Sequence, residues 1–265
     1  LFSDRPEHAS PYSPSSRQFL NTLFIDVEAV ADYGECEKAQ NLVQTDSFQA
    51  RLRALKAAEL VDYQGVAEAK AEVLELLYRH FCNHHLNNDS ERGRAFRTYQ
   101  KEMGEALFHH SLFEALQEHF SGKDSSIRGW QSWPQPYRDP RSKKVTTFAT
   151  SHARRIEFYQ YLQWQAQLQL LEAGHRSWEL GLGVGLYQDQ AVSIDPDGAD
   201  AWANQDIYAL DAHIGSPPDD YNLKGQDWGL PPPIPTRLET SAYAHFIATL
   251  RQNMRATGAL RIDHV

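Results

Sequence analysis

The closing residues of the chain bring together three side chains that could act on a substrate. Arg261, Asp263 and His264 all lie in the final segment "LRIDHV". Alternate residues of a strand face the same side, so Arg261 and Asp263 should share one face and His264 should lie on the other. The cation would hold the carboxylate ionised, as a nucleophile at the anomeric carbon of a sugar requires. A salt bridge that only satisfies its own charges fits this spacing equally well.

The elements around these residues predict how they are positioned. The segment "WELGLGVGLYQDQAV", residues 178–192, is typical of a buried strand and ends in the polar run that contains Asp189. An amphipathic helix over 240–256 precedes a short apolar strand over 259–265. Strand, connection, helix and strand form a βαβ unit, so we expect the two strands to be parallel and adjacent, with their polar ends at one edge.

Most of the preceding chain is predicted to be helical. Apolar residues between 35 and 175 recur at helical spacing, and the last of these helices should end at Gly174. The clearest stripe is formed by Val66, Ala69, Val73, Leu77 and Phe81. In contrast, residues 215–235 are expected to form a long loop without secondary structure, whose Tyr221 and Trp228 favour a functional role.

Composition excludes several classes of partner. The 265 residues are 41% apolar, enough for a sizeable core, and 26 basic against 35 acidic residues give a net charge of −9. A negative chain repels phosphate backbones and anionic lipids, so we expect neither a nucleic-acid nor a membrane partner. The two cysteines, Cys36 and Cys82, are too few for a disulfide framework and indicate a reducing, cytoplasmic location.

Three further motifs resemble cofactor or metal sites, and for each we favour an ordinary structural interpretation. "GLGVG" at 181–185 lacks the spacing of a dinucleotide loop. "HFCNHH" at 80–85 places His80 and His84 four residues apart, but without a second ligand pair it is interpreted as a polar helix end. "DPDGAD" at 195–200 is interpreted as a turn that caps a helix rather than a calcium loop. The sequence therefore predicts no metal and no cofactor.

Segments distributed over nearly the whole chain resemble the 4-α-glucanotransferases, or amylomaltases, of glycoside hydrolase family 77. They occur in the family's order and are "SPYSPSSRQFLN" (10–21), "GLYQDQAV" (185–192), "GADAWAN" (198–204), "GSPPDDYNLKGQDWGLP" (215–231) and "LRIDHV" (260–265). The resemblance implies an α/β fold, a partial (β/α)8 TIM barrel with a largely α-helical insertion. Residues 1–34 would follow the second barrel strand, 35–175 would form the insertion, and 176–265 would hold the third and fourth strands with a substrate-covering loop.

The resemblance also implies a role for individual residues. Asp263 would be the nucleophile that forms a covalent glucosyl intermediate, Arg261 would keep it ionised, and His264 would be its companion near the donor sugar. Asp189 would bind sugar hydroxyls and Tyr12 would stack on the donor ring. Asp219, Tyr221 and Trp228 would contact the glucan from the covering loop.

The implied activity is transfer of α-1,4-glucan segments to an acceptor glucan or glucose by a retaining double displacement, within maltodextrin and glycogen metabolism. Its acid/base glutamate would lie beyond Val265, so we expect this chain to be a catalytically incomplete fragment. Its partners would be maltooligosaccharides and α-1,4-glucans. A related α-glucan hydrolase and a non-catalytic glucan-binding module remain as alternatives, and the sequence does not predict an oligomeric state.

Overall fold

The computed structural model describes residues 10–124 and 126–263. Their contacts divide the chain into two compact units. The larger unit comprises Leu1–Leu20, Phe108–Ile156 and Leu170–Val265, and the helical unit comprises Asn21–Leu107 and Glu157–Gln169. The boundaries expected at residues 34 and 175 separate barrel segments from a helical insertion. These contacts do not test which residues belong to a barrel, so the boundaries stay a prediction.

The helical unit consists of short helices packed around longer ones, as the apolar stripes predicted. Its complete elements are η2 (Thr22–Phe24), η3 (Ala31–Gly34), α1 (Glu37–Gln44), α2 (Asp46–Ala57), α3 (Tyr63–Phe81) and the π-helical turn η4 (Cys82–Leu86). It also contains the first part of α4 (Glu91–Ser121), which is interrupted at Gly104, and the middle of α6 (Ala153–Glu179). The predicted stripe is confirmed on α3, where Val73, Leu77 and Phe81 are buried.

The core of the helical unit is aromatic and encloses one buried charge. Phe81 packs edge to face against Phe96 with ring centroids 5.5 Å apart. Asp32 is fully buried, and its Oδ2 accepts hydrogen bonds from Arg92 (2.7 Å) and from the hydroxyl of Tyr161 (2.6 Å). These bonds satisfy the charge of Oδ2, as burial of a carboxylate requires.

The larger unit contains the remaining helices and all strands of the described residues. The helices are η5 (Trp130–Ser132), η6 (Gln135–Tyr137), α5 (Lys143–Ser151), α7 (Ala199–Ala203), α8 (Pro235–Thr240) and α9 (Ala244–Asn253), with the outer parts of α4 and α6. The predicted end of α6 at Gly174 is wrong, because the helix continues to Glu179. Gly174 serves another purpose: a Cβ there would lie 2.5 Å from the carbonyl oxygen of Ala256.

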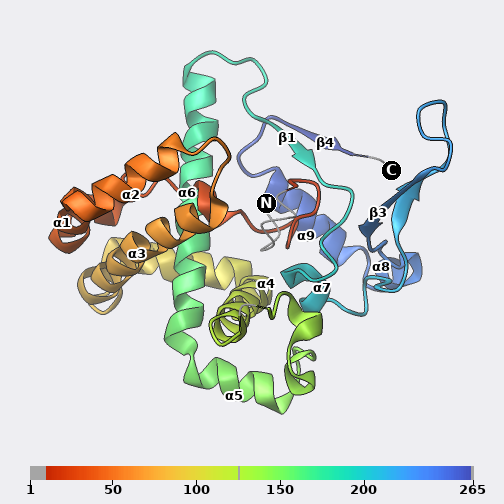
Figure 1. Cartoon of the computed structure of the whole chain (residues 1–265), viewed down its shortest axis with the longest axis horizontal. Coiled ribbons are helices and arrows are strands. Elements are labelled where there is room, and N and C mark those ends of the chain that lie inside the picture. The colour runs from red at the N-terminus through yellow and green to blue at the C-terminus, as the bar shows by residue number, and fades with distance from the viewer. Residues whose placement is uncertain (1–9, 125, 264–265) are drawn as a thin grey trace. The chain divides into compact units, whose positions relative to one another are not determined.

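The predicted parallel strand pair is confirmed. Strands β1 (Tyr187–Gln190) and β4 (Ala259–Ile262) lie side by side (Figure 1) and are parallel, with Asp189 opposite Arg261. The first strand is shorter than the 178–192 predicted, because α6 occupies residues up to 179 and a turn follows it. Positive φ angles at Gly181 and Gly185 form that turn.

The stretch expected to be an unstructured loop forms a β-hairpin instead. Strands β2 (Ile214–Ser216) and β3 (Gln226–Leu230) pair antiparallel, with a register shift at Ile214 and Gly215. A Cβ at Gly215 would lie 1.9 Å from the carbonyl oxygen of Gln226, so only glycine allows the two backbones to approach this closely. The hairpin gives the segment a defined backbone with its tip at residues 217–225.

The helix predicted over 240–256 is confirmed as α9 (Ala244–Asn253), which is shorter than predicted at both ends. α8 ends at Thr240, and α9 begins at Ala244 after Ala242 and Tyr243 adopt left-handed backbone angles (φ 49° and 58°). The backbone N–H of Tyr243 donates to the carbonyl of Leu238 (2.7 Å), which closes α8 as a helix C-cap does.

The described residues therefore form an α/β fold that is rich in helix, with two two-stranded sheets. No helix among residues 10–124 and 126–263 combines the length and apolarity needed to span a bilayer.

Candidate active site

The polar ends of β1 and β4 meet through one guanidinium group. Arg261 Nη1 lies 2.5 Å from Asp189 Oδ2, and Arg261 Nη2 lies 2.6 Å from Asp263 Oδ1. The parallel register places Arg261 opposite Asp189. The predicted sharing of one face by Arg261 and Asp263 is confirmed by their direct contact. The arrangement holds two carboxylates from neighbouring strand ends on a single cation.

Electrostatics and burial differ along this bridge. The hydrogen bond that Arg261 donates to Asp189, followed by the charges of Asp189 and Asp263, raises the pKa of the Arg261 guanidinium, so it is a permanent cation. The Asp263 side chain is 13% exposed, whereas that of Arg261 is 47% exposed. Asp263 is therefore the better shielded member of the ion pair, as suits a group that reacts in a partly dry site.

Asp263 opens into a pocket of about 550 Å³ in the larger unit. Tyr12 and Trp228 line the same pocket, so three residues predicted from separate segments converge on one cavity. The pocket is lined by Ser10, Tyr12, Ser13, Val192, Asp195, Pro196, Trp228, Gly229, Leu230 and Asp263. Aromatic rings beside a carboxylate are suited to a sugar, which has an apolar face and polar edges.

The segment that carries Tyr12 is anchored at the N-terminus of α7. Ser16 Oγ donates to Asp200 Oδ1 (2.7 Å), and the backbone N–H of Arg17 donates to Asp200 Oδ2 (3.0 Å). In return, the backbone N–H of Asp200 donates to the carbonyl of Ser15 (3.0 Å). The buried Asp200 thus joins "SPSSR" to "GADAW", two of the segments that carried the resemblance.

The sequence analysis did not predict the second carboxylate of the pocket, Asp195, as a site residue. Asp195 is 7% exposed and lines the pocket together with Asp263. The predicted turn is confirmed, because Asp195 Oδ1 accepts from the backbone N–H of Asp197 (2.9 Å) and α7 follows, but the N-cap residue of α7 is Gly198, which has no side chain to cap the helix. The available signal was its position shortly after β1, on the carboxyl side of a parallel strand, where sites form in such folds.

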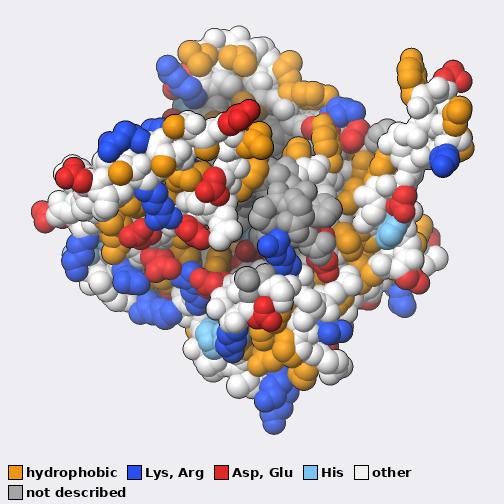
Figure 2. Space-filling view, viewed as in Figure 1, with side chains coloured by type: hydrophobic (Ala, Val, Ile, Leu, Met, Phe, Trp, Pro, Cys, Tyr) orange, Lys and Arg blue, Asp and Glu red, His pale blue; other side chains and the backbone are white. Residues whose placement is uncertain are grey.

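Two predicted substrate contacts lie away from the pocket lining. Asp219 and Tyr221 are at the tip of the β2–β3 hairpin, which projects with apolar side chains on it (Figure 2). Asp219 Oδ1 accepts from the backbone N–H groups of Tyr221 (2.8 Å) and Asn222 (2.6 Å), so it shapes the turn. The Tyr221 side chain is 99% exposed. His264 lies outside the described residues.

Comparison with known proteins identifies a family and relatives that this chain resembles. The family described as 4-alpha-glucanotransferase, glycoside hydrolase family 77, matches residues 2–265. A 4-alpha-glucanotransferase of Haemophilus influenzae is 35% identical, over 98% of this chain and 38% of its own length. One from Mycobacterium tuberculosis is 33% identical, over 98% of this chain and 34% of its own length. The chain thus spans little more than a third of these relatives.

Solved structures share the fold. The amylomaltase of Corynebacterium glutamicum superposes with a TM-score of 0.79 at 27% identity, covering 100% of this chain and 34% of that chain. The amylomaltase of Streptococcus agalactiae in complex with acarbose gives 0.76 at 22% identity, covering 97% of this chain and 49% of that one. The second likeness is one of fold alone.

Proposed function

The chain belongs to glycoside hydrolase family 77, the 4-alpha-glucanotransferases, and from this premise we propose that the whole protein transfers α-1,4-glucan segments to an acceptor glucan or glucose. The observation that carries the proposal is the convergence of Asp263, Tyr12 and Trp228 on one pocket, with Arg261 bound to the carboxylate. The family resemblance alone would not say which pocket is used.

The proposed chemistry is a retaining double displacement with Asp263 as the nucleophile. A carboxylate oxygen forms a bond to the anomeric carbon of the donor as the bond to the leaving O4 breaks, and an acid supplies the proton to O4. The acceptor hydroxyl then displaces the carboxylate and gives up its proton to the same acid/base. Two carboxyl groups about 5–5.5 Å apart are needed for this reaction class.

Arg261 is proposed to keep the Asp263 carboxylate anionic and to hold it in a fixed orientation. A guanidinium stays charged, so its positive charge opposes protonation of the carboxylate beside it. By bridging to Asp189 at the same time, it holds the end of β4 against the end of β1. Asp189 is proposed to bind sugar hydroxyls as well, and His264 to assist near the donor sugar, as the family resemblance implies.

The aromatic residues are proposed to bind the glucan. Tyr12 and Trp228 would pack against the apolar faces of glucose units on either side of the cleaved linkage. The hairpin with Asp219 and Tyr221 would cover the acceptor side, since transfer is favoured over hydrolysis when water is kept from the intermediate. The match to the 4-alpha-glucanotransferase family and its relatives supports an α-glucan as the class of ligand.

The fold of the whole protein is proposed to be a (β/α)8 barrel in which β1 and β4 are the third and fourth strands. The parallel pairing of β1 with β4 and the fit to the C. glutamicum amylomaltase support this assignment. We further propose a cytoplasmic role in maltodextrin and glycogen metabolism. The two free, buried cysteines support the location.

The test is an assay of the full-length gene product with maltotriose as both donor and acceptor. We expect longer maltooligosaccharides to accumulate faster than reducing ends, because transfer conserves the number of glycosidic bonds. A rise in reducing ends that matches the loss of maltotriose would instead assign the protein to the α-glucan hydrolases. Binding of maltotriose without turnover would reduce the function to glucan binding.

A further inference from the structure

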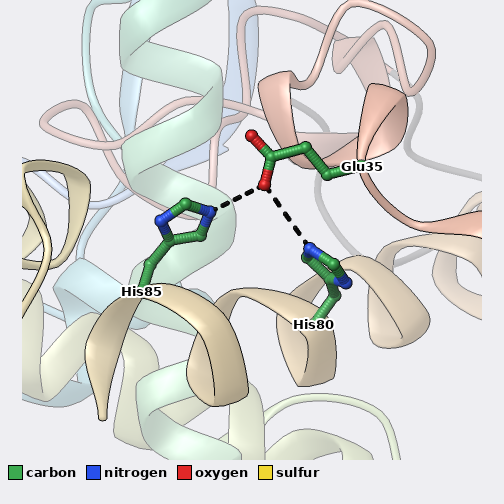
Figure 3. A group of neighbouring side chains, drawn as sticks. All are labelled: Glu35, His80 and His85. Atoms are coloured by element: carbon green, nitrogen blue, oxygen red, sulfur yellow. Dashed lines mark hydrogen bonds and ion pairs between the residues drawn. The ribbon is translucent and has the colours of Figure 1, made fainter. Parts of the chain in front are cut away.

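Three potential metal ligands converge in the helical unit, outside the pocket described above. Glu35 follows η3, His80 lies in the last turn of α3, and His85 lies in η4 (Figure 3). His85 Nε2 is 3.0 Å and His80 Nε2 is 3.5 Å from the same Glu35 oxygen, Oε2. One ligand atom from each of the three residues lies within 4.8 Å of the other two.

A change in helical repeat makes this convergence possible. A π-helix bonds residue i to i+5, so its turn is wider than that of an α-helix. Residues 82–86 adopt this conformation directly after α3 and bring His85 round to the carboxylate that His80 faces. His80 and His84, which are four residues apart, do not converge on the carboxylate in this way. The exposed His84 instead stacks on His80, with ring centroids 4.2 Å apart.

The ring of His85 is held in the orientation that a ligand needs. Its Nδ1 lies 3.0 Å from Ser90 Oγ, and that oxygen also accepts the backbone N–H of Gly93 (3.1 Å). When Nδ1–H donates to Ser90, the lone pair of His85 is left on Nε2, the atom that faces Glu35. Metal-binding histidines are oriented in the same way by a second hydrogen bond.

Two buried polar atoms beside the cluster lack a hydrogen-bond partner among the described residues. One is His80 Nε2, and the other is Asp32 Oδ1, which lies 3.8 Å from His85 Nε2. Asp32 is fully buried, and only its other oxygen is bonded to Arg92 and Tyr161. A buried polar atom without a hydrogen-bond partner is costly, and a cation bound by His80 Nε2 would give that atom a partner.

We propose that Glu35, His80 and His85 bind a divalent transition-metal ion, with Zn²⁺ as the best match. Two imidazole nitrogens and one carboxylate oxygen form a ligand set that suits Zn²⁺, and water would complete the tetrahedron.

Metal binding requires only a small closure of the cluster. Ligands about 2.0–2.1 Å from Zn²⁺ lie roughly 3.3 Å apart in a tetrahedron, less than the largest separation here. Glu35 can provide the movement, because its side chain is 53% exposed. The ion would join residue 35 to residues 80–85 across a long connection, and so act as a clip within the helical unit. It takes no part in the sugar chemistry proposed above.

The test is titration of the full-length protein with ZnCl₂ by calorimetry and thermal unfolding, compared across variants. We expect saturable binding of one Zn²⁺ per chain at this site, a rise in the melting temperature, and at least tenfold weaker binding in His80→Gln and His85→Gln. His84→Gln and His175→Gln are the matched controls. His84 neighbours the cluster, and His175 forms a surface pair with Glu179 (3.7 Å), so loss of either should change nothing.

A second measurement covers variants that fold poorly. Glu35→Gln changes an exposed side chain, and Co²⁺ in place of Zn²⁺ should give the visible absorption of a tetrahedral nitrogen and oxygen site, weakened in this variant. Absence of saturable binding to the native protein would overturn the proposal. So would binding that is equally strong in the native protein, His80→Gln, His85→Gln and Glu35→Gln.

Discussion

The strand-end cluster around Asp263 and the helical cluster around Glu35 both place a carboxylate beside nitrogen-containing side chains. Arg261 Nη2 lies 2.6 Å from Asp263 Oδ1, and His85 Nε2 lies 3.0 Å from Glu35 Oε2. Their partners differ in one respect that decides the chemistry. Arg261 has donors but no lone pair, whereas His80 and His85 each carry a lone pair when neutral. The guanidinium can only donate hydrogen bonds to its carboxylate, while the imidazoles can share a third, cationic partner with theirs.

Burial follows the same division. Asp263 is 13% exposed and opens into a cavity, whereas Glu35 is 53% exposed and does not line that cavity. A shielded, permanently paired anion suits attack on an electrophile, and an exposed, movable one suits ion capture. A carboxylate beside a nitrogen-containing side chain can therefore serve different functions, and whether that side chain is an arginine or a histidine distinguishes the two sites.

The largest expected effect comes from removing the shielded anion. Asp263→Asn in the full-length protein should lower kcat for maltotriose transfer by about 10⁴-fold or more, because an amide is not a nucleophile at this carbon. Asp195→Asn is the matched control, since Asp195 lines the same pocket. It should cost about tenfold or less, the scale of one hydrogen bond. A larger loss in Asp195→Asn than in Asp263→Asn would exchange their roles.

The partner of the anion should matter next. Arg261→Ala removes both contacts of the bridge and should lower kcat by about 10²–10³-fold, the scale of one electrostatic contact in a site. Arg261→Lys keeps the charge but not the fork that reaches two carboxylates, so it should recover only part of the loss. Steady-state kinetics of both variants measure the loss of kcat. Full activity in Arg261→Ala would show that Arg261 has no role in the reaction.

Substitutions in the pocket and at the hairpin tip should differ in their effect on KM rather than on kcat. Trp228→Ala and Tyr12→Ala should each raise KM for maltotriose about tenfold, because each removes an aromatic face from the pocket. Tyr221→Ala should raise KM by less, since Tyr221 lies on the exposed tip. Equal effects for Tyr221 and Trp228 would show that the tip closes onto the substrate as tightly as the pocket wall.

A further nitrogen side chain, the buried His110, should affect stability rather than activity. Burial lowers the pKa of His110 to about 3, so the folded protein keeps it neutral, while the unfolded chain protonates it below about pH 6.5. The unfolded state binds the extra proton between these values, so stability from this residue is lost as pH falls from 6.5 to 3.

The free energy of unfolding of His110→Gln should therefore fall less steeply than that of the native protein, by about 1.4 kcal/mol per pH unit between pH 6 and pH 4. Denaturant titrations at several pH values measure the two slopes. Parallel slopes would show that His110 is protonated in the folded state, in contrast with its burial beside Phe19, where the ring centroids are 4.4 Å apart.

The strand-end cluster could be predicted because its information is local. Arg261 and Asp263 are two residues apart, and one βαβ connection brings Asp189 opposite Arg261. Tyr12 and Trp228 came from the family resemblance, and only the folded chain places them beside Asp263 in one cavity.

The features that sequence reasoning missed depend on contacts distant in the chain. Gly174 resembles a helix end but meets the backbone of Ala256, and Gly215 resembles a loop residue but meets Gln226 across a hairpin. The helical cluster combines Glu35 with histidines 45 and 50 positions later, through a π-turn that no apolar period signals. Tertiary packing decided these cases against local preference.

The most direct test of the central claim is to trap the glycosyl intermediate on the full-length protein. A donor with a good leaving group, such as an α-maltosyl fluoride, should accumulate the covalent form when acceptor is withheld. We predict that peptide mass spectrometry finds the added glycosyl mass on Asp263 and that Asp263→Asn abolishes it. A glycosyl adduct on Asp195 or Asp189 instead would contradict the account.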